Sequence, residues 1–174
     1  MSDIFNNQVN EPVTIVIFGA SGDLTQRKLI PALFSAFQKK LLPEEFSIIG
    51  FARREYDDEK FRNLMRDSLL ESFDNDEDLL NKFISHIFYS RGDVASADSF
   101  KSLDNLMKKN KFAENRLYYL SIMPSLFETA VKSLNERGLI SDPHSSNWTR
   151  VVVEKPFGRD LSSALELNNK LLEY

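Results

Sequence analysis

The sequence has no cysteine among its 174 residues. Disulfide bonds, thiolate metal ligands and cysteine nucleophiles are therefore excluded, and we expect no metal site. Glycine and proline are also sparse, with six residues of each, and they do not gather into a linker that would divide the chain. No internal repeat and no low-complexity tract is present, so the sequence predicts one domain.

An excess of positive charge is also missing. Lysine and arginine total 22 against 26 aspartates and glutamates, which gives a formal net charge of −4. Because nucleic-acid-binding domains carry basic patches, this balance predicts no nucleic-acid partner.

Long apolar runs are absent too, since none approaches the roughly 20 residues that span a bilayer. Residues 1–12, MSDIFNNQVNEP, are polar and acidic, unlike a signal peptide, which is basic and then apolar. We expect a flexible N-terminus over 1–12, an unprocessed soluble chain, no membrane association and a cytoplasmic location.

Short apolar segments rich in β-branched and aromatic residues alternate with segments of helical periodicity. The predicted strands are 13–18, 46–52, 86–89, 116–121 and 149–154. The predicted helices are 26–40, 57–72, 76–85, 96–109, 124–137 and 160–173. Acidic residues at 57–59 and Asp160 are placed to cap helices, and Gly138 is placed to end one.

The strands are apolar at nearly every position, which predicts a sheet covered on both faces, and helical crossovers predict parallel pairing. The fold class is therefore α/β, with a doubly wound, mainly parallel Rossmann-type sheet and helices on both faces. This dinucleotide-binding domain is expected to occupy residues 13–174.

The first strand runs directly into Gly-Ala-Ser-Gly-Asp-Leu, residues 19–24, and then into a helix. Gly19 suits a tight turn, Gly22 lets a ligand approach the backbone, and the helix N-terminus offers unpaired N–H groups to a phosphate. The pattern departs from G-x-G-x-x-G because Ser21 stands near the second glycine's place and no third glycine follows. The alternative is a glycine turn that merely reverses the chain.

The second strand ends at Arg53-Arg54, where NAD-selective enzymes usually carry an acidic residue. A guanidinium matches a ribose 2′-phosphate, so Arg53 favours NADP, with Arg54 and Ser21 as supporting contacts. NAD remains possible. The alternative is a pair of solvated arginines beside Glu55.

Two further segments follow strands at the same predicted edge of the sheet. Met123-Pro124 follows the fourth strand, and Lys155-Pro156 follows the fifth. Lys155 could meet an anionic or hydroxyl-rich substrate, or it could be a solvated lysine paired with Glu154 or Asp160. Lys28 lies near the start of the first helix, where a cation is unfavourable without an anion nearby.

From about Pro12 onward, the sequence resembles the glucose-6-phosphate dehydrogenases. The resemblance rests on GASGDL, the basic Arg27-Lys28, GFARRE, YYLSIMPSLF and RVVVEKPFGRDL, which match in order and spacing. It implies oxidation of the C1 hydroxyl of β-D-glucose 6-phosphate to 6-phosphoglucono-δ-lactone with transfer of a hydride to NADP+. This reaction is the first step of the pentose phosphate pathway of carbohydrate metabolism.

The resemblance also implies roles for individual residues. The coenzyme-binding residues would be Gly19, Ala20, Ser21, Gly22, Asp23, Leu24, Arg53, Arg54, Met123 and Pro124. Lys28 and Lys155 would bind the sugar phosphate, and Lys155 would be catalytic, positioned by a movable, sometimes cis, bond to Pro156. The family's turn usually continues Ala-Lys-Lys/Arg-Lys, whereas this chain has Thr-Gln-Arg-Lys at 25–28, so the first lysine of the basic cluster is missing.

The family places its catalytic histidine in an Arg-Ile-Asp-His-Tyr-Leu-Gly-Lys-Glu stretch after the EKPFG helix, and this chain does not contain that stretch. His86 and His144 are expected to be structural or solvated. The last helical segment has no C-cap signal. We therefore expect a coenzyme-binding domain without its C-terminal α+β substrate and dimerisation domain, inactive alone and homo-oligomeric in the full-length protein. The alternatives are a stand-alone NADP-binding sensor or interaction module, and a Rossmann oxidoreductase for another sugar.

Overall fold

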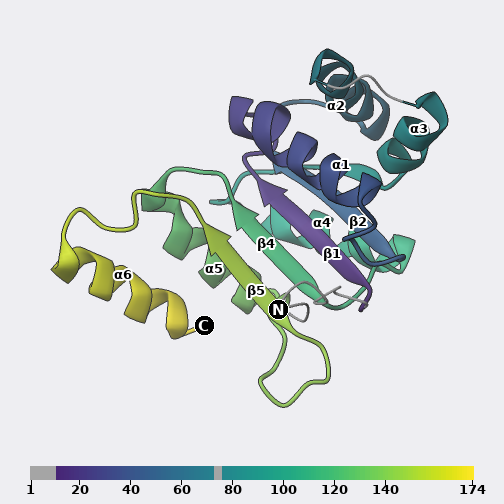
Figure 1. The fold of residues 1–174 in the computed structure, drawn as a ribbon. Helices are drawn as coiled ribbons and strands as arrows, with labels where there is room; N and C mark the ends of the chain where they lie inside the picture. The colour runs from purple at the N-terminus through teal and green to yellow at the C-terminus, as the bar shows by residue number, and fades with distance from the viewer. Residues whose placement is uncertain (1–10, 73–75) are drawn as a thin grey trace, which may run out of the picture.

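The computed structural model describes residues 11–72 and 76–174, in which one parallel sheet is flanked by helices (Figure 1). The strands are β1 (Val13–Phe18), β2 (Phe46–Ala52), β3 (Ile87–Arg91), β4 (Arg116–Leu120) and β5 (Thr149–Val153). They lie in the order β3-β2-β1-β4-β5 and all pair in parallel. The predicted doubly wound α/β fold is confirmed, while residues 1–10 of the predicted flexible N-terminus lie outside the described residues.

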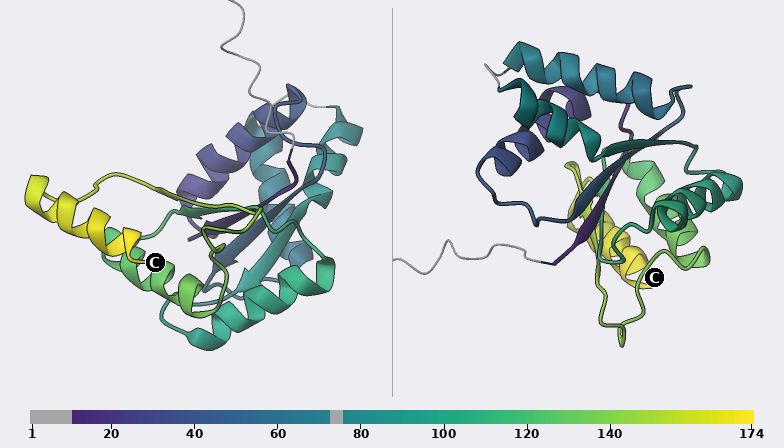
Figure 2. Two further views of the ribbon diagram at one scale, coloured as in Figure 1. Left: turned by 90° about the horizontal axis from the view of Figure 1, so that it is seen from below. Right: turned by 90° about the vertical axis from the view of Figure 1, so that its right-hand side faces the viewer.

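Helices cover the two faces of the sheet in two groups (Figure 2). One face carries the π-helical turn η1 (Thr25–Leu29), α1 (Ile30–Gln38), α2 (Asp58–Ser72) and α3 (Glu77–Ser85). The other carries α4 (Ala97–Asn110), the 3-10 turn η2 (Pro124–Leu126), α5 (Phe127–Glu136) and α6 (Leu161–Leu172). Within 11–72 and 76–174, none of the helices has the length and apolar character needed to cross a membrane.

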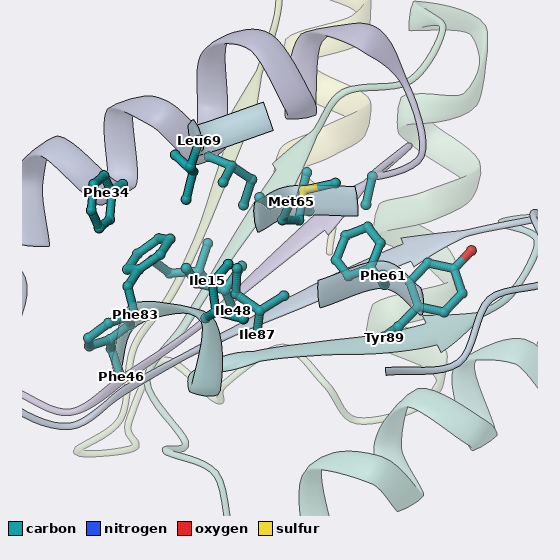
Figure 3. Close-up of a cluster of buried hydrophobic side chains, with 14 of the residues drawn as sticks. Ile15, Phe34, Phe46, Ile48, Phe61, Met65, Leu69, Phe83, Ile87 and Tyr89 are labelled. Atoms are coloured by element: carbon teal, nitrogen blue, oxygen red, sulfur yellow. The ribbon is translucent and has the colours of Figure 1, made fainter. Parts of the chain in front are cut away.

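The central strand β1 supplies both halves of the core because its side chains alternate between the faces. Ile15 and Ile17 join the cluster under α1, α2 and α3, which includes Phe34 and Phe61 and is drawn in Figure 3. Phe18 joins the cluster on the opposite face. All six residues of β1 are buried, as predicted from their apolar character, and each large apolar side chain contributes about 1.5–3 kcal/mol of stability.

The prediction that both faces of every strand are covered is wrong for β5. Val151 and Val152 are 37% and 36% exposed. β5 is an edge strand, and the helices on one face of the sheet pack over β1, β2 and β3. On the other face α6 packs on α5, where Lys170 pairs with Glu128 at 3.5 Å. An apolar run shows that a strand is suited to burial, whereas its place in the sheet decides how much of it is covered.

The predicted helix starts are confirmed where a side chain caps them. The Asp57 carboxylate accepts a 2.7 Å hydrogen bond from the Lys60 N–H, and Asp160 forms a capping box with Ser163. The segment predicted as one helix over 26–40 instead begins with the π-helical turn η1. Its Gln26 carbonyl accepts a 2.6 Å hydrogen bond from the hydroxyl of Ser68 on α2, which satisfies the carbonyl from outside the helix.

Just beyond the end of β1, the backbone of Gly19 lies against the backbone of Ser121, the residue that follows β4. Gly19 has φ +78°, and a Cβ built on it would overlap the carbonyl oxygen of Ser121 and lie 2.9 Å from the carbonyl carbon. The N–H of Ser121 donates to Phe18 O at 3.0 Å, and the N–H of Gly19 donates to Phe51 O at 2.9 Å. Three strand ends are thereby joined at a point where no side chain fits.

Gly19→Ala should destabilise the chain by about 3 kcal/mol, since it combines left-handed backbone strain of about 1–2 kcal/mol with overpacking of similar size. Gly138→Ala is a matched control, because Gly138 has φ +71° but nothing within 4 Å of an added Cβ, and it should cost only the strain. Urea denaturation of both variants measures the difference. Equal losses would show that the contact with Ser121 does not constrain residue 19.

Candidate functional site

A cleft of about 550 Å³ lies along the edge where the strands end at their carboxyl termini. Every strand of the sheet contributes residues to it, either at its last positions or just beyond them. The lining residues are Gly19, Leu24, Phe51, Ala52, Arg53, Gly92, Asp93, Val94, Ser121, Ile122, Met123, Leu126 and Glu154. In open α/β sheets this edge, and above all the point between β1 and β4 where the strand order reverses, is where ligands bind.

The walls of the cleft are mainly apolar, with Phe51, Val94 and Ile122 among them, while its charged groups are few. Arg53 stands beyond β2, Asp93 beyond β3 and Glu154 beyond β5, so a carboxylate lies on each side of β1 and Arg53 is the one basic residue among the described lining residues. Apolar walls with a few convergent polar groups are typical of sites for cofactors and small molecules.

The glycine turn forms a compact connection from β1 to the helix. The N–H of Gly22 donates to Gly19 O at 2.9 Å, and helical backbone begins at Asp23. The first N–H groups of a helix have no acceptor within that helix, and they carry the positive end of its dipole. The backbone at Asp23 and Leu24 therefore offers donors for an anion at the edge of the sheet.

The side chains of this turn have separate environments. Ala20 is fully buried, 3.0 Å from a Cβ built on Gly50, so its methyl group belongs to the core. The Asp23 carboxylate is exposed and pairs with Arg27 at 2.6 Å. Leu24 lines the cleft together with Gly19, whereas the intervening residues, Ser21 and Gly22 among them, are not part of its lining.

Arg53 is exposed on the cleft, and its side chain makes no hydrogen bond or ion pair within the described residues. The predicted alternative placed it beside Glu55, but the Glu55 carboxylate pairs instead with Arg91 at 2.7 Å. The Arg53 guanidinium is therefore available to an anionic ligand at the cleft.

Arg54 is placed differently from its neighbour. Its Nη1 donates to the hydroxyl of Tyr56 at 3.2 Å, and this hydrogen bond is the main cause that raises the pKa of Arg54 above its ordinary value. Arg54 does not line the cleft, so the structure does not bring the two predicted arginines together there.

Met123 and Pro124 are also divided. Met123 is 65% exposed and lines the cleft beyond β4, whereas Pro124 begins η2 outside the lining. The exposed Met123 side chain gives the cleft an adaptable apolar contact.

Lys28 and Lys155 are both exposed, and neither forms an ion pair in the part of the chain that the structure describes. For Lys155 the two predicted alternative partners have other contacts. Glu154 accepts a hydrogen bond from the Tyr119 hydroxyl, and Asp160 caps α6. The Lys155–Pro156 peptide bond is cis, one of the two forms that the family resemblance implied.

Glu154 connects the cleft to β4, because its carboxylate accepts a hydrogen bond from the hydroxyl of the half-buried Tyr119. Burial of the Tyr119 hydroxyl and, after it, the hydrogen bond to Glu154 raise the pKa of Tyr119 to about 12. The Tyr119 hydroxyl therefore stays protonated near neutral pH and donates a hydrogen bond that holds the Glu154 carboxylate in place.

Of the lining residues, the sequence predicted Gly19, Leu24, Arg53 and Met123. It missed Phe51, Ala52, Ser121, Ile122, Leu126 and Glu154, and the three residues beyond β3, namely Gly92, Asp93 and Val94. The predicted third strand stopped at residue 89, but β3 continues to Arg91, which places Gly-Asp-Val at the ligand edge. The rule that parallel strands end at one edge would have identified them had the strand been extended.

The two histidines lie away from the cleft. His86 precedes β3, where its ring stacks on Phe46 with centroids 4.2 Å apart and its Nδ1 lies 2.9 Å from Phe46 O. His144 is exposed in the loop over residues 141–147. Neither lines the cleft.

Residues 16–174 match the family model described as "Glucose-6-phosphate dehydrogenase, NAD binding domain". A chloroplastic glucose-6-phosphate 1-dehydrogenase of Spinacia oleracea is 38% identical over 167 residues, covering 93% of this chain and 28% of the relative. Glucose-6-phosphate 1-dehydrogenase of Aggregatibacter actinomycetemcomitans is 41% identical over 162 residues, covering 91% of this chain and 32% of the relative. The chain thus spans less than a third of the length of these relatives.

Solved structures agree with the sequence relatives. Glucose-6-phosphate 1-dehydrogenase from Mycobacterium avium superposes with a TM-score of 0.78 at 30% identity, covering 93% of this chain and 34% of that one. A glucose-6-phosphate dehydrogenase in complex with its substrate glucose-6-phosphate gives a TM-score of 0.76 at 34% identity, covering 95% and 35%. With the family model matched from β1 to the last residue, the chain belongs to the glucose-6-phosphate dehydrogenase NAD-binding domain family.

Proposed function

We propose that this chain is the NADP-binding part of a glucose-6-phosphate 1-dehydrogenase. The whole enzyme would oxidise β-D-glucose 6-phosphate to 6-phosphoglucono-δ-lactone. The observation that carries the proposal is the Arg53 guanidinium, which has no hydrogen-bond or ion-pair partner within residues 11–72 and 76–174 and stands on a cleft beside the glycine turn, in a chain of this family.

The residues present fit both anionic groups of the coenzyme, its pyrophosphate bridge and its 2′-phosphate. The backbone donors at the start of the first helix suit the pyrophosphate. A guanidinium forms charge-assisted, bidentate hydrogen bonds with a phosphate, so Arg53 suits the 2′-phosphate that distinguishes NADP from NAD. NAD retains every other contact, and NAD binding therefore stays part of the proposal at lower affinity.

Bound NADP+ supplies the hydride acceptor for the sugar's C1 carbon. Lys155 follows Glu154, which lines the cleft, so its ammonium group can bind the sugar's hydroxyl or phosphate oxygens at the β5 end. Lys28, exposed in η1, adds a second positive charge for the phosphate on the β1 side.

Hydride loss from an alcohol also requires a base for the hydroxyl proton, and histidine suits this near neutral pH. The sequence contains two histidines, and neither lines the cleft. We therefore place the base in the additional part of the longer relatives, so that residues 1–174 bind NADP without catalysis. Homo-oligomerisation of the longer protein and a cytoplasmic location stay predictions, the latter because some relatives are named as chloroplastic.

Arg53→Ala should weaken NADP binding by about 1.5–3 kcal/mol, the value of a hydrogen bond to a charged group, while NAD binding changes little. Isothermal titration calorimetry with both coenzymes measures this. Arg54→Ala is the matched control, because Arg54 is an adjacent exposed arginine outside the cleft lining, and it should affect NADP much less. Equal losses for NADP and NAD in Arg53→Ala would place Arg53 away from the 2′-phosphate.

Lys155→Ala in the full-length enzyme should lower kcat/KM for glucose 6-phosphate by at least about a hundredfold, the scale of losing a positioned charged contact at the reacting centre, with NADP affinity within several fold. Lys132→Ala, on the exposed side of α5, is the control and should keep wild-type rates. Steady-state kinetics measures both variants. If Lys155→Ala were as active as the control, Lys155 would be a solvated lysine that does not bind the substrate.

Residues 1–174 alone should bind NADP but should not reduce it in the presence of glucose 6-phosphate. The reason is the missing base, and the assay is absorbance in the reduced-nicotinamide band at saturating concentrations of both compounds. Turnover that co-purifies with the chain would contradict the assignment of the base to another part of the protein.

A further inference from the structure

Tyr89 contacts the backbone on both sides of Arg53. Its side chain projects from β3 and is 7% exposed. The hydroxyl lies 3.0 Å from Ala52 O and 2.6 Å from Arg54 O. These are the carbonyl oxygens of the residues immediately before and after Arg53, and the one hydroxyl proton is shared between two acceptors.

The position of this hydroxyl is set by ring packing on two sides, against Phe61 of α2 in the core and against Tyr56 in the loop that follows β2. The Tyr89 ring packs against Phe61 with centroids 4.9 Å apart and against Tyr56 at 5.6 Å. In Figure 3 the ring lies beside Phe61 with its oxygen directed away from the apolar cluster. The Tyr89 N–H also donates to the Asp58 carboxylate at 2.6 Å, so ring and backbone are both fixed.

Both carbonyl oxygens have a second donor. The Gly92 N–H donates to Ala52 O at 2.9 Å, and the Tyr56 N–H donates to Arg54 O at 3.1 Å. Removing the hydroxyl would therefore leave neither carbonyl without a partner. Its distinctive contribution is to hold two peptide groups, one on each side of Arg53, against one fixed hydroxyl group. The direction in which the Arg53 side chain projects from the backbone is thereby fixed.

Arg53 depends on this direction because, among the described residues, no hydrogen bond or ion pair of its own side chain holds it. The neighbouring charges are already engaged, Glu55 with Arg91 and Arg54 with Tyr56. Burial raises the pKa of Tyr89 to about 12, so the hydroxyl remains a neutral donor across the physiological range of pH.

We propose that Tyr89 is a positioning residue for coenzyme selectivity, which acts through Arg53 by fixing the backbone on either side of it. This inference rests on the proposed function, in which Arg53 binds the 2′-phosphate of NADP. Tyr89 itself does not line the cleft and needs no contact with the coenzyme.

The test is a double-mutant cycle on the 174-residue chain with Tyr89→Phe, Arg53→Ala and the double variant. Calorimetry measures the dissociation constants of NADP and NAD, and thermal unfolding records stability. Tyr89→Phe keeps the ring packing and should weaken NADP binding about three- to tenfold, the range for loss of one hydrogen bond, while NAD binding stays within twofold. In the Arg53→Ala background, Tyr89→Phe should have no further effect on NADP.

Tyr118→Phe is the matched control, since its buried hydroxyl donates to Leu139 O at 2.7 Å outside the cleft. It should lower thermal stability without changing the ratio of NADP to NAD affinity. A Tyr89→Phe chain that loses both coenzymes equally, or that no longer folds, would assign the hydroxyl to general stability and overturn the inference. So would an equal NADP loss in both backgrounds.

The failures of the two proposals are distinguishable. If the wild-type chain binds NADP no better than NAD, or Arg53→Ala leaves the ratio unchanged, the proposed function of Arg53 is wrong. If Arg53→Ala removes the preference while Tyr89→Phe leaves it intact, the proposed role of Tyr89 alone is wrong.

Discussion

The backbone contact between Gly19 and Ser121 is the constraint on which the rest of the site depends. A side chain at residue 19 would overlap the Ser121 carbonyl group, so β1 and β4 can approach at their carboxyl ends only because glycine is present. This approach brings the first helix and the segment beyond β4 to the same point of the sheet. The cleft opens there because the chain turns away in opposite directions from the two strands.

The cleft carries charged groups on both sides of β1. Arg53, whose side chain has no partner in the part of the chain that the structure describes, provides positive charge beyond β2, whereas the Glu154 carboxylate beyond β5 accepts a hydrogen bond from Tyr119. β2 and β5 lie on opposite sides of β1 and β4, and Asp93 beyond β3 adds a carboxylate on the Arg53 side. In the proposed function, Arg53 would bind the 2′-phosphate and the exposed Lys155 would meet the sugar beyond β5.

The sequence predicted β1 and β2 to the residue, because each is a run of apolar residues followed by residues that end a strand, a glycine turn or an arginine pair. It could not predict the exposure of Val151 and Val152, since that depends on which helices reach the edge of the sheet. Likewise, the sequence could not predict that Glu55 pairs with Arg91, 36 residues away, and not with the nearby Arg53.

A crystal structure of the chain with bound NADP+ tests the central claim most directly. The account predicts the pyrophosphate at the backbone N–H groups of the turn over residues 19–24, and the 2′-phosphate within hydrogen-bond distance of the Arg53 guanidinium. A coenzyme bound elsewhere, or bound in the cleft with its 2′-phosphate turned away from Arg53, would contradict it.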